Sequence, residues 1–426
     1  DAIGVFNHDE TNGTVDAVWT YLYSGITDAN AAIDNIEAAS TVSAPLKTRL
    51  INEAKFLRAL YYFYLVQLFG DLPLVLHTDE GIGATRASIE EVYAQIVEDL
   101  TSAANALPSS YSGADYGRAT NGAAYALLAK VNLVWAQTGS SEHTNHRYEA
   151  AIAAANKVTG YALEEEYLDN WNTSKRNEGK ERIFATNHVI AQYPEGGGRN
   201  HLAHCSFATG FDDATPHLII SDIRFYNKFD DNDQRKRGSY AKTLFNPATG
   251  EDFTFTLPRF RKYIDTLNIA TTNKNLNIDR TILRYADVLL IKAEALNELN
   301  HGPSAEAYEA INQVRRRAFR HFPLTIASAD DVPSGLSYEQ FREAVREERF
   351  FEFVYEQQRW FDLVRWRILV KTVKVIPGKE GVSLKHYRFA IPKSQRDINP
   401  EGLWQNWGWS GADESKTGAN PYAGFE

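Results

Sequence analysis

The chain has 426 residues, of which 43% are hydrophobic and 23% charged, values typical of a globular protein that buries a large core. Its formal net charge of −10 argues against a nucleic-acid partner, because nucleic-acid binders present a basic face. Cys205 is the only cysteine, which excludes an intramolecular disulfide, and no apolar run of about 18 residues predicts a membrane-spanning helix.

The N-terminal part of the chain has the periodicity of amphipathic helices. Gly70 and Pro73 end the most regular of these segments, because glycine supplies a left-handed residue and proline prevents continuation. The first helix is predicted over 18–36, with a stripe of Leu22, Ile26, Ala29, Ile33 and Ile36. The second is predicted over about 46–69, with one apolar face of Leu57, Leu60, Tyr61, Tyr64, Leu65 and Leu68.

Three further helices are predicted before residue 160. Ser88 and Glu91 have the spacing of a capping box, in which the serine oxygen accepts from the third helical amide and the glutamate reaches back. A helix therefore begins there and ends near residue 107. The small-residue run 120–136 and the segment 148–158 are predicted to form the next two.

The pattern changes between about 160 and 280, where Gly, Pro, Asn and Asp are frequent and periodicity is poor. Short mixed runs such as 253–257 predict small strands in this block. Helices then resume in three segments: 282–299, 304–319 and 338 to about 373. The last of these begins with a second capping box, from Ser337 to Gln340.

The tail, 376–426, is rich in loops and contains Trp404, Trp407 and Trp409 close together. We expect these tryptophans to pin the tail to the scaffold, although an exposed one could face a partner. The aromatic residues inside the predicted helices are instead expected in the core: Tyr61, Phe63, Trp360 and Trp366.

Helices that arrive in pairs of about 34 residues are typical of tetratricopeptide repeats, whose faces must stack to be buried. The predicted fold is therefore mainly α, a tetratricopeptide-like helix-pair scaffold with an irregular central insertion that contains short strands. We interpret 1–426 as one domain. Its parts are a helical scaffold at about 15–160 and 280–375, an irregular elaboration at about 160–280, and the tail at 376–426.

No catalytic, metal or cofactor site is predicted. A glycoside hydrolase needs two carboxylates that face each other across a cleft, whereas the acids here are adjacent, as in 164–166, 212–213 and 230–231. His201, His204 and Cys205 form the one metal-like cluster, but no second ligand pair accompanies it. A hydrolase remains an alternative without a recognisable catalytic motif.

Carbohydrate binding requires flat aromatic faces combined with short polar groups, and such mixtures occur on predicted loops. One lies just before the first helix and the other in the central block, where loops on a rigid scaffold favour binding. For any single aromatic residue, packing within a loop or the core is the commoner explanation. The candidate ligand-binding residues are Phe6, Asn7, Asp9, Tyr193, Arg199, Asn200, Phe207, Phe211 and Tyr226.

Several long segments resemble the SusD/RagB family of nutrient-binding proteins. The hallmark is the string EAKFLRALYYFYLVQLFGDLPLV at 53–75. The string RYADVLLIKAEAL at 284–296 and the run that begins REERFFEF at 346 are similar to downstream family segments. Further matches at 19–30 and 391–400 follow in the same order, so the resemblance spans about residues 18–400 and lies mainly in the helical scaffold.

The resemblance implies four tetratricopeptide-like helix pairs and a lipid anchor on an N-terminal cysteine, which is not among these residues. It implies a surface-exposed lipoprotein of the outer membrane that captures an oligosaccharide without catalysis. It further implies a partner, a SusC-like TonB-dependent barrel that imports the ligand. The family tends to place ligand contacts in the loop that holds Phe6, Asn7 and Asp9.

Three alternatives remain open. A RagB-like member would capture peptides or protein fragments instead of glycans, and would present a strand edge or deep pockets. A glycoside hydrolase would release new sugar ends from a polysaccharide. A purely structural lid would bind neither glycan nor peptide.

Overall fold

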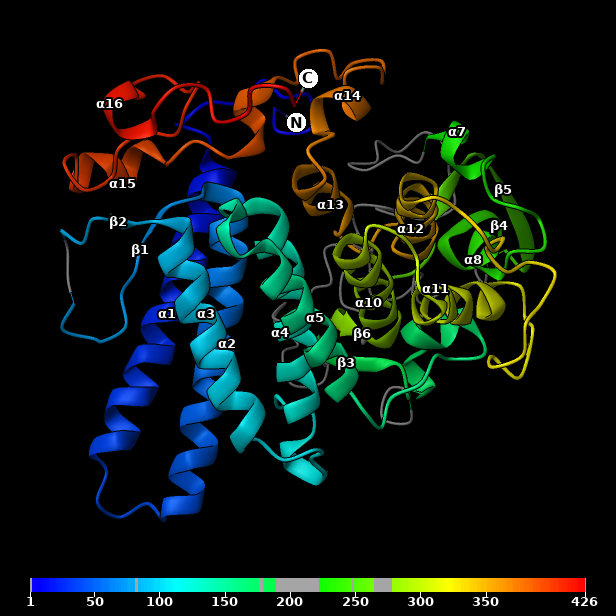
Figure 1. Cartoon of the computed structure of the whole chain (residues 1–426), viewed down its shortest axis with the longest axis horizontal. Helices are drawn as coiled ribbons and strands as arrows, with labels where there is room; N and C mark the ends of the chain where they lie inside the picture. Colours follow the sequence, from blue (N-terminus) through cyan, green and yellow to red (C-terminus); the bar gives the residue numbers. More distant parts are fainter. Residues whose placement is uncertain are drawn as a thin grey trace. The chain divides into compact units, whose positions relative to one another are not determined.

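Helices form most of the computed structural model (Figure 1). The chain divides into two compact units: unit 1 comprises Asp1–Tyr111, Arg118–Ala154 and Arg359–Glu426, and unit 2 comprises Ser112–Gly117 and Ala155–Gln358. The single domain expected over the whole chain stays a prediction. The residues that the structure describes are 2–80, 83–175, 179–188, 222–246, 249–263 and 278–425.

Unit 1 is built on helices that pack in chain order, α1 on α2, α2 on α3 and α3 on α4. Figure 1 shows α1 and α2 as a long antiparallel hairpin. The helix α1 begins where the Asn12 side chain accepts hydrogen bonds from the amides of Thr14 and Val15. The bounds are α1 Gly13–Ala38, α2 Ala44–Phe69, α3 Ile89–Ala106, α4 Asn121–Thr138 and α5 Thr144–Lys157. The helices predicted up to residue 160 are therefore confirmed.

The predicted apolar face of α2 is wrong in one respect: the helix is buried on most of its circumference. Tyr61, Tyr64 and other members of the predicted stripe are only partly buried. Leu60 and Leu65 of the stripe are buried, but so are side chains on the other faces of the helix: Phe56, Tyr62, Phe63, Val66 and Phe69. The reason is that α1 and α3 both pack against α2, so a central helix needs apolar residues on several faces.

A buried polar clamp joins the first three helices. The Arg58 guanidinium of α2 donates two hydrogen bonds to the Asp99 carboxylate of α3, both at 2.8 Å. It also donates to the Asn30 side-chain oxygen of α1 at 2.9 Å. Burying an arginine is tolerable only when its donors are paired, and here partners on both neighbouring helices pair them.

Short elements complete unit 1 and hold the tail at one end of the helices. The strands β1 (Leu72–Pro73) and β2 (Arg86–Ala87) pair in antiparallel register just after Gly70, whose φ is +80°. The Arg365 guanidinium at the end of α13 donates to the Gln137 side chain of α4 at 2.6 Å. The helices of this part are α13 Arg359–Arg365, α14 Leu369–Val373, η6 Leu384–Tyr387, α15 Lys393–Ile398 and α16 Glu414–Thr417.

The described residues of unit 2 form three main helices and two antiparallel strand pairs, β3 with β6 and β4 with β5. The strands are β3 Arg182–Thr186, β4 Tyr240–Asn246, β5 Glu251–Phe260 and β6 Arg280–Arg284. The main helices are α10 Tyr285–Asn300, α11 Ala305–Ala318 and α12 Tyr338–Glu352. The shorter helices are α7 Ile223–Tyr226 and α8 Gln234–Ser239, with single turns at Tyr167–Trp171 (η3) and Thr173–Lys175 (η4). Two further single turns lie nearer the N-terminus, Gly113–Asp115 (η1) and Ser141–His143 (η2). The mainly α fold with short strands in the central block is confirmed.

A network of buried ion pairs forms the polar centre of unit 2. Arg284 pairs with Glu181 at 2.7 Å and with Glu356 at 2.8 Å. Glu352 accepts from three guanidiniums, those of Arg235, Arg284 and Arg317, and its own side chain is fully buried. These arginines hold the pKa of Glu352 far below its usual value although burial opposes the charge.

The predicted continuous helix at 338 to about 373 is wrong, because α12 ends at Glu352 and α13 begins only at Arg359. Tyr355 and Gln357 between them have φ values of +62° and +61°, a conformation that a right-handed helix does not contain. The Glu356 carboxylate reaches Lys262 at 2.6 Å, so the break lies beside a buried ion pair. The predicted helix at 282–299 likewise starts later, since 280–284 forms β6.

Candidate functional site

The N-terminal loop and the C-terminal tail meet at one end of unit 1. The Phe6 ring stacks on Trp360 with centroids 6.0 Å apart and approaches the edge of His386 at 5.3 Å. The backbone oxygens of Val5 and Phe6 lie 3.0 and 3.3 Å from where a side chain at Gly381 would begin. A Cβ atom at residue 381 would crowd these oxygens, so the glycine favours the close approach of the loop to the tail.

Two buried histidines lie in the aromatic cluster behind this contact. The rings of His8 and His386 have centroids 5.5 Å apart, and both pack on Trp409, at 5.1 and 5.4 Å. Burial and the nearby Lys385 lower the pKa of His386 to about 4, and the same two causes lower the pKa of His8. Both imidazoles are therefore neutral at pH 7.

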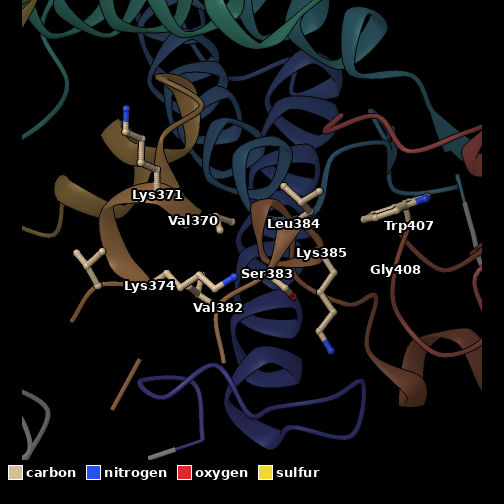
Figure 2. Close-up of a pocket in the computed structure, with 10 residues that line it drawn as sticks. Val370, Lys371, Lys374, Val382, Ser383, Leu384, Lys385, Trp407 and Gly408 are labelled. Atoms are coloured by element: carbon tan, nitrogen blue, oxygen red, sulfur yellow. The ribbon is translucent and has the colours of Figure 1, made fainter. Parts of the chain in front are cut away.

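A pocket of about 630 Å³ opens beside this cluster, within the size range of ligand sites in proteins. Three chain segments line it: α14, the residues that lead into η6, and the turn at Trp407 and Gly408. Figure 2 shows α14 and the Trp407 turn on opposite sides of residues 382–385. The lining residues are Val370, Lys371, Lys374, Val375, Val382, Ser383, Leu384, Lys385, Trp407 and Gly408.

The pocket rests on the hydrophobic core of unit 1. Val370 and Val382 belong to a buried cluster against which Phe6 and Leu384 also pack. The Trp407 indole is partly buried and meets the ring of Tyr422 edge-on at 5.9 Å. The apolar wall is therefore held by packing, which is what an aromatic ring needs in order to present one face to a ligand.

Lysines surround the pocket. Lys371 and Lys374 are exposed, and Lys385 is partly buried with its ammonium nitrogen 4.4 Å from the centroid of Trp409. Among the residues that the structure describes, no carboxylate forms an ion pair with any of the three. In Figure 2 the side chain of Lys374 extends toward Ser383.

The loop residues predicted to bind ligand lie close together at this end of unit 1. Phe6 is partly buried in the packing described above, and Asn7 is exposed. The Asp9 carboxylate accepts hydrogen bonds from the amide and hydroxyl of Thr11, at 2.8 and 2.6 Å, and these bonds lower the pKa of Asp9. Asp9 thus forms the turn that precedes α1.

Tyr226, the candidate in unit 2, ends α7 and is partly buried. Its ring meets Tyr240 edge-on at 5.6 Å, and the Lys236 ammonium lies 4.8 Å from its centroid. The remaining candidates lie outside the described residues: Tyr193, Arg199, Asn200, Phe207 and Phe211. The same holds for His201, His204 and Cys205. The predicted binding roles of all these residues stay predictions.

From the sequence we expected Trp407 to pin the tail or to face a partner, and we did not consider the lysines. The one local signal was the spacing of Lys371 and Lys374, which places two cations on the same side of a helical turn. Trp407 lies at the same pocket as these lysines only because of the path of the tail, and a periodic sequence pattern does not predict that path.

Within the described part of the chain, no three His, Cys, Asp or Glu side chains are placed to hold a metal ion. The same residues include no helix with the length and apolar character needed to cross a membrane.

The fold and the sequence together define the class of protein. A family model described as "SusD family" matches residues 133–383, and a second, described as "Starch-binding associating with outer membrane", matches residues 5–133. The chain belongs to the SusD family, which confirms the resemblance drawn from the sequence.

Individual relatives agree with this assignment. The chain is 30% identical to SusD-like protein P25 of Formosa agariphila, over 91% of this chain and 78% of the relative. A SusD homolog from Bacteroides thetaiotaomicron superposes with a TM-score of 0.81 at 28% identity, covering 95% of this chain and 88% of the other. Surface glycan-binding protein A from Bacteroides fluxus shares the fold, with a TM-score of 0.76 at 23% identity over 96% and 88%.

Proposed function

We propose that the protein binds an oligosaccharide at the outer membrane surface, without hydrolysing it, and delivers it to a SusC-like TonB-dependent barrel. Its membership of the SusD family and the outer-membrane description of the model that matches residues 5–133 support this proposal. A protein of the same fold is named a surface glycan-binding protein, which agrees with the same function.

The observation that supports the proposal best is the pocket at Trp407. An indole wall suits the apolar face of a sugar ring, while the exposed Ser383 hydroxyl suits its hydroxyls. The affinity of one such site is expected to be modest, because sugar hydroxyls exchange water for protein hydrogen bonds at little net gain.

Calorimetric titration with oligosaccharides tests the proposal. We expect Trp407→Ala to weaken binding about tenfold, or about 1.4 kcal/mol. The matched control is Tyr21→Ala, because Tyr21 is 75% exposed on α1 and lines no part of the pocket. Saccharide binding that is equal in wild type and Trp407→Ala would place the site elsewhere.

Two further measurements separate the alternatives. Incubation with polysaccharides should release no new reducing ends, and their release would support a hydrolase. A peptide library should give no binding, and a tight peptide ligand would support the RagB-like alternative. Delivery is tested by co-purification with the barrel and by uptake in cells that lack the protein.

A further inference from the structure

The charge of the pocket differs from that of the chain as a whole. The chain has a net charge of −10, yet the stretch from residue 370 to residue 385 contains four lysines and one acid. Lys379 donates its ammonium protons to the carbonyl oxygen of Gly4, and Glu380 accepts from the Gly378 amide at 2.9 Å. Lys371, Lys374 and Lys385 remain at the pocket without a carboxylate partner among the described residues.

These three lysines line the pocket together with an apolar wall. A ligand that fills the pocket therefore meets valines, a leucine and an indole together with positive charge from the lysines that line it. Unpaired ammonium groups around a concave apolar surface concentrate anions and favour a ligand that carries its own negative charge.

The groups that face the pocket from behind do not cancel this charge. His8 and His386 are neutral at pH 7, as described above, and they add no negative charge. The Asp9 carboxylate interacts electrostatically with Lys385 and offsets part of its charge, but its oxygen is bonded to Thr11 and not to the lysine. The Lys385 ammonium lies against the Trp409 ring, so its position is fixed by an aromatic neighbour and not by an acid.

Resting on the function proposed above, we propose that this pocket selects acidic saccharides, sugars that carry a carboxylate or a sulfate ester. The sugar ring packs on Trp407, and the anionic substituent lies toward Lys374, whose side chain extends toward Ser383, with Lys371 and Lys385 adding positive charge nearby. A neutral sugar uses Trp407 and Ser383 without this charge contact and binds less tightly.

The probes are three trisaccharides of matched length: a galacturonic acid trimer, a neutral galactose trimer and a sulfated galactose trimer. We expect at least one acidic trimer to bind about tenfold more tightly than the neutral one, and to lose this advantage between 20 and 200 mM NaCl, because salt screens exposed charges. The two acidic probes distinguish carboxylate from sulfate.

The variant Lys371→Gln with Lys374→Gln should weaken acidic binding about fivefold and leave neutral binding unchanged. Its matched control, Lys47→Gln with Lys393→Gln, removes the same total charge outside the pocket, at one partly buried and one exposed position. Equal loss in both double variants would overturn the inference, because it would reflect net charge alone.

Equal affinity for neutral and acidic trimers would refute the selectivity and leave glycan binding intact. A glutamate tripeptide that binds as tightly as the acidic sugars would also overturn the inference, because the pocket would then recognise negative charge without requiring a sugar. Failure of the folded protein to bind any saccharide would refute the proposed function as well.

Discussion

Lys385 holds its ammonium nitrogen 4.4 Å from the centroid of the Trp409 ring, and Trp409 is itself 5% exposed. The indole nitrogen of Trp409 donates to the Arg388 carbonyl oxygen at 3.0 Å, so the ring is fixed from both sides. One pocket lysine is therefore supported by the buried cluster that joins the N-terminal loop to the tail.

Trp409 and Trp407 should therefore differ in how much each contributes to stability. We expect Trp409→Ala to cost about 3–5 kcal/mol of unfolding free energy, because it leaves a cavity under the pocket. Trp407→Ala removes a partly buried ring at the wall and should cost about 1 kcal/mol. Urea denaturation of both variants checks the contrast, and equal losses would contradict the assignment of Trp407 to the pocket wall.

The contact between α1 and α2 gives a prediction with an unusual sign. Replacing glycine by alanine inside a helix normally stabilises it by about 1 kcal/mol. A Cβ atom at Gly25, however, would lie 2.5 Å from the Tyr61 ring. We therefore expect Gly25→Ala to destabilise the protein by about 1–3 kcal/mol, measured by denaturant unfolding.

Two variants control this result. Gly13→Ala, at the start of α1 where nothing lies within 4 Å of the added atom, should be close to neutral. Adding Tyr61→Leu to Gly25→Ala should restore part of the lost stability, because the smaller side chain relieves the clash. A stabilising Gly25→Ala would show that the two helices separate without cost.

The buried ion pairs at the centre of unit 2 predict that a single conservative substitution lowers the free energy of unfolding strongly. Glu352→Gln leaves Arg235, Arg284 and Arg317 buried around an uncharged group, and we expect a loss of about 3–5 kcal/mol. Glu343→Gln on the same helix is the control, since its exposed pair with Arg346 should contribute less than about 1 kcal/mol. If thermal unfolding shows similar losses of stability for Glu352→Gln and Glu343→Gln, burial of the ion pairs does not determine their contribution.

The sequence predicted the helices whose signals are local. Both capping boxes form as expected, at Ser88 and at Ser337, because a cap depends only on residues three positions apart. The break after Glu352 was missed, since the left-handed residues Tyr355 and Gln357 lie beside buried charges that come from distant segments. Periodicity carries no information about such partners.

The pocket was missed for a related reason. Lys371 and Trp407 are 36 positions apart, and each has an ordinary explanation when considered alone. Their neighbourhood depends on the path of the tail, which Gly381 and Gly408 permit by avoiding clashes with Phe6 and Lys385. Which residues meet at such glycines depends on the tertiary structure, so a sequence pattern cannot identify them as neighbours.

The buried histidines predict how stability depends on pH. The pKa of His386 is lowered from 6.5 to about 4 by burial and by Lys385, so the unfolded chain binds a proton more readily than the folded one. Stability must then fall as pH decreases from about 6.5 to about 4, and it is independent of this group above that range. The full shift corresponds to about 3 kcal/mol, and the lowered pKa of His8 acts in the same direction.

Urea denaturation at pH 7.5 and pH 4.5 checks this for wild type and His386→Gln. The variant loses some packing at both values, but its stability should decrease less between them, because its side chain does not titrate. The exposed His146 supplies the control: it faces Glu149 at 3.8 Å, and His146→Gln should leave the pH dependence unchanged. If the free energy of unfolding of His386→Gln decreases with pH as steeply as that of wild type, the His386 imidazole does not set the acid sensitivity. Carboxylates elsewhere in the protein would then set it.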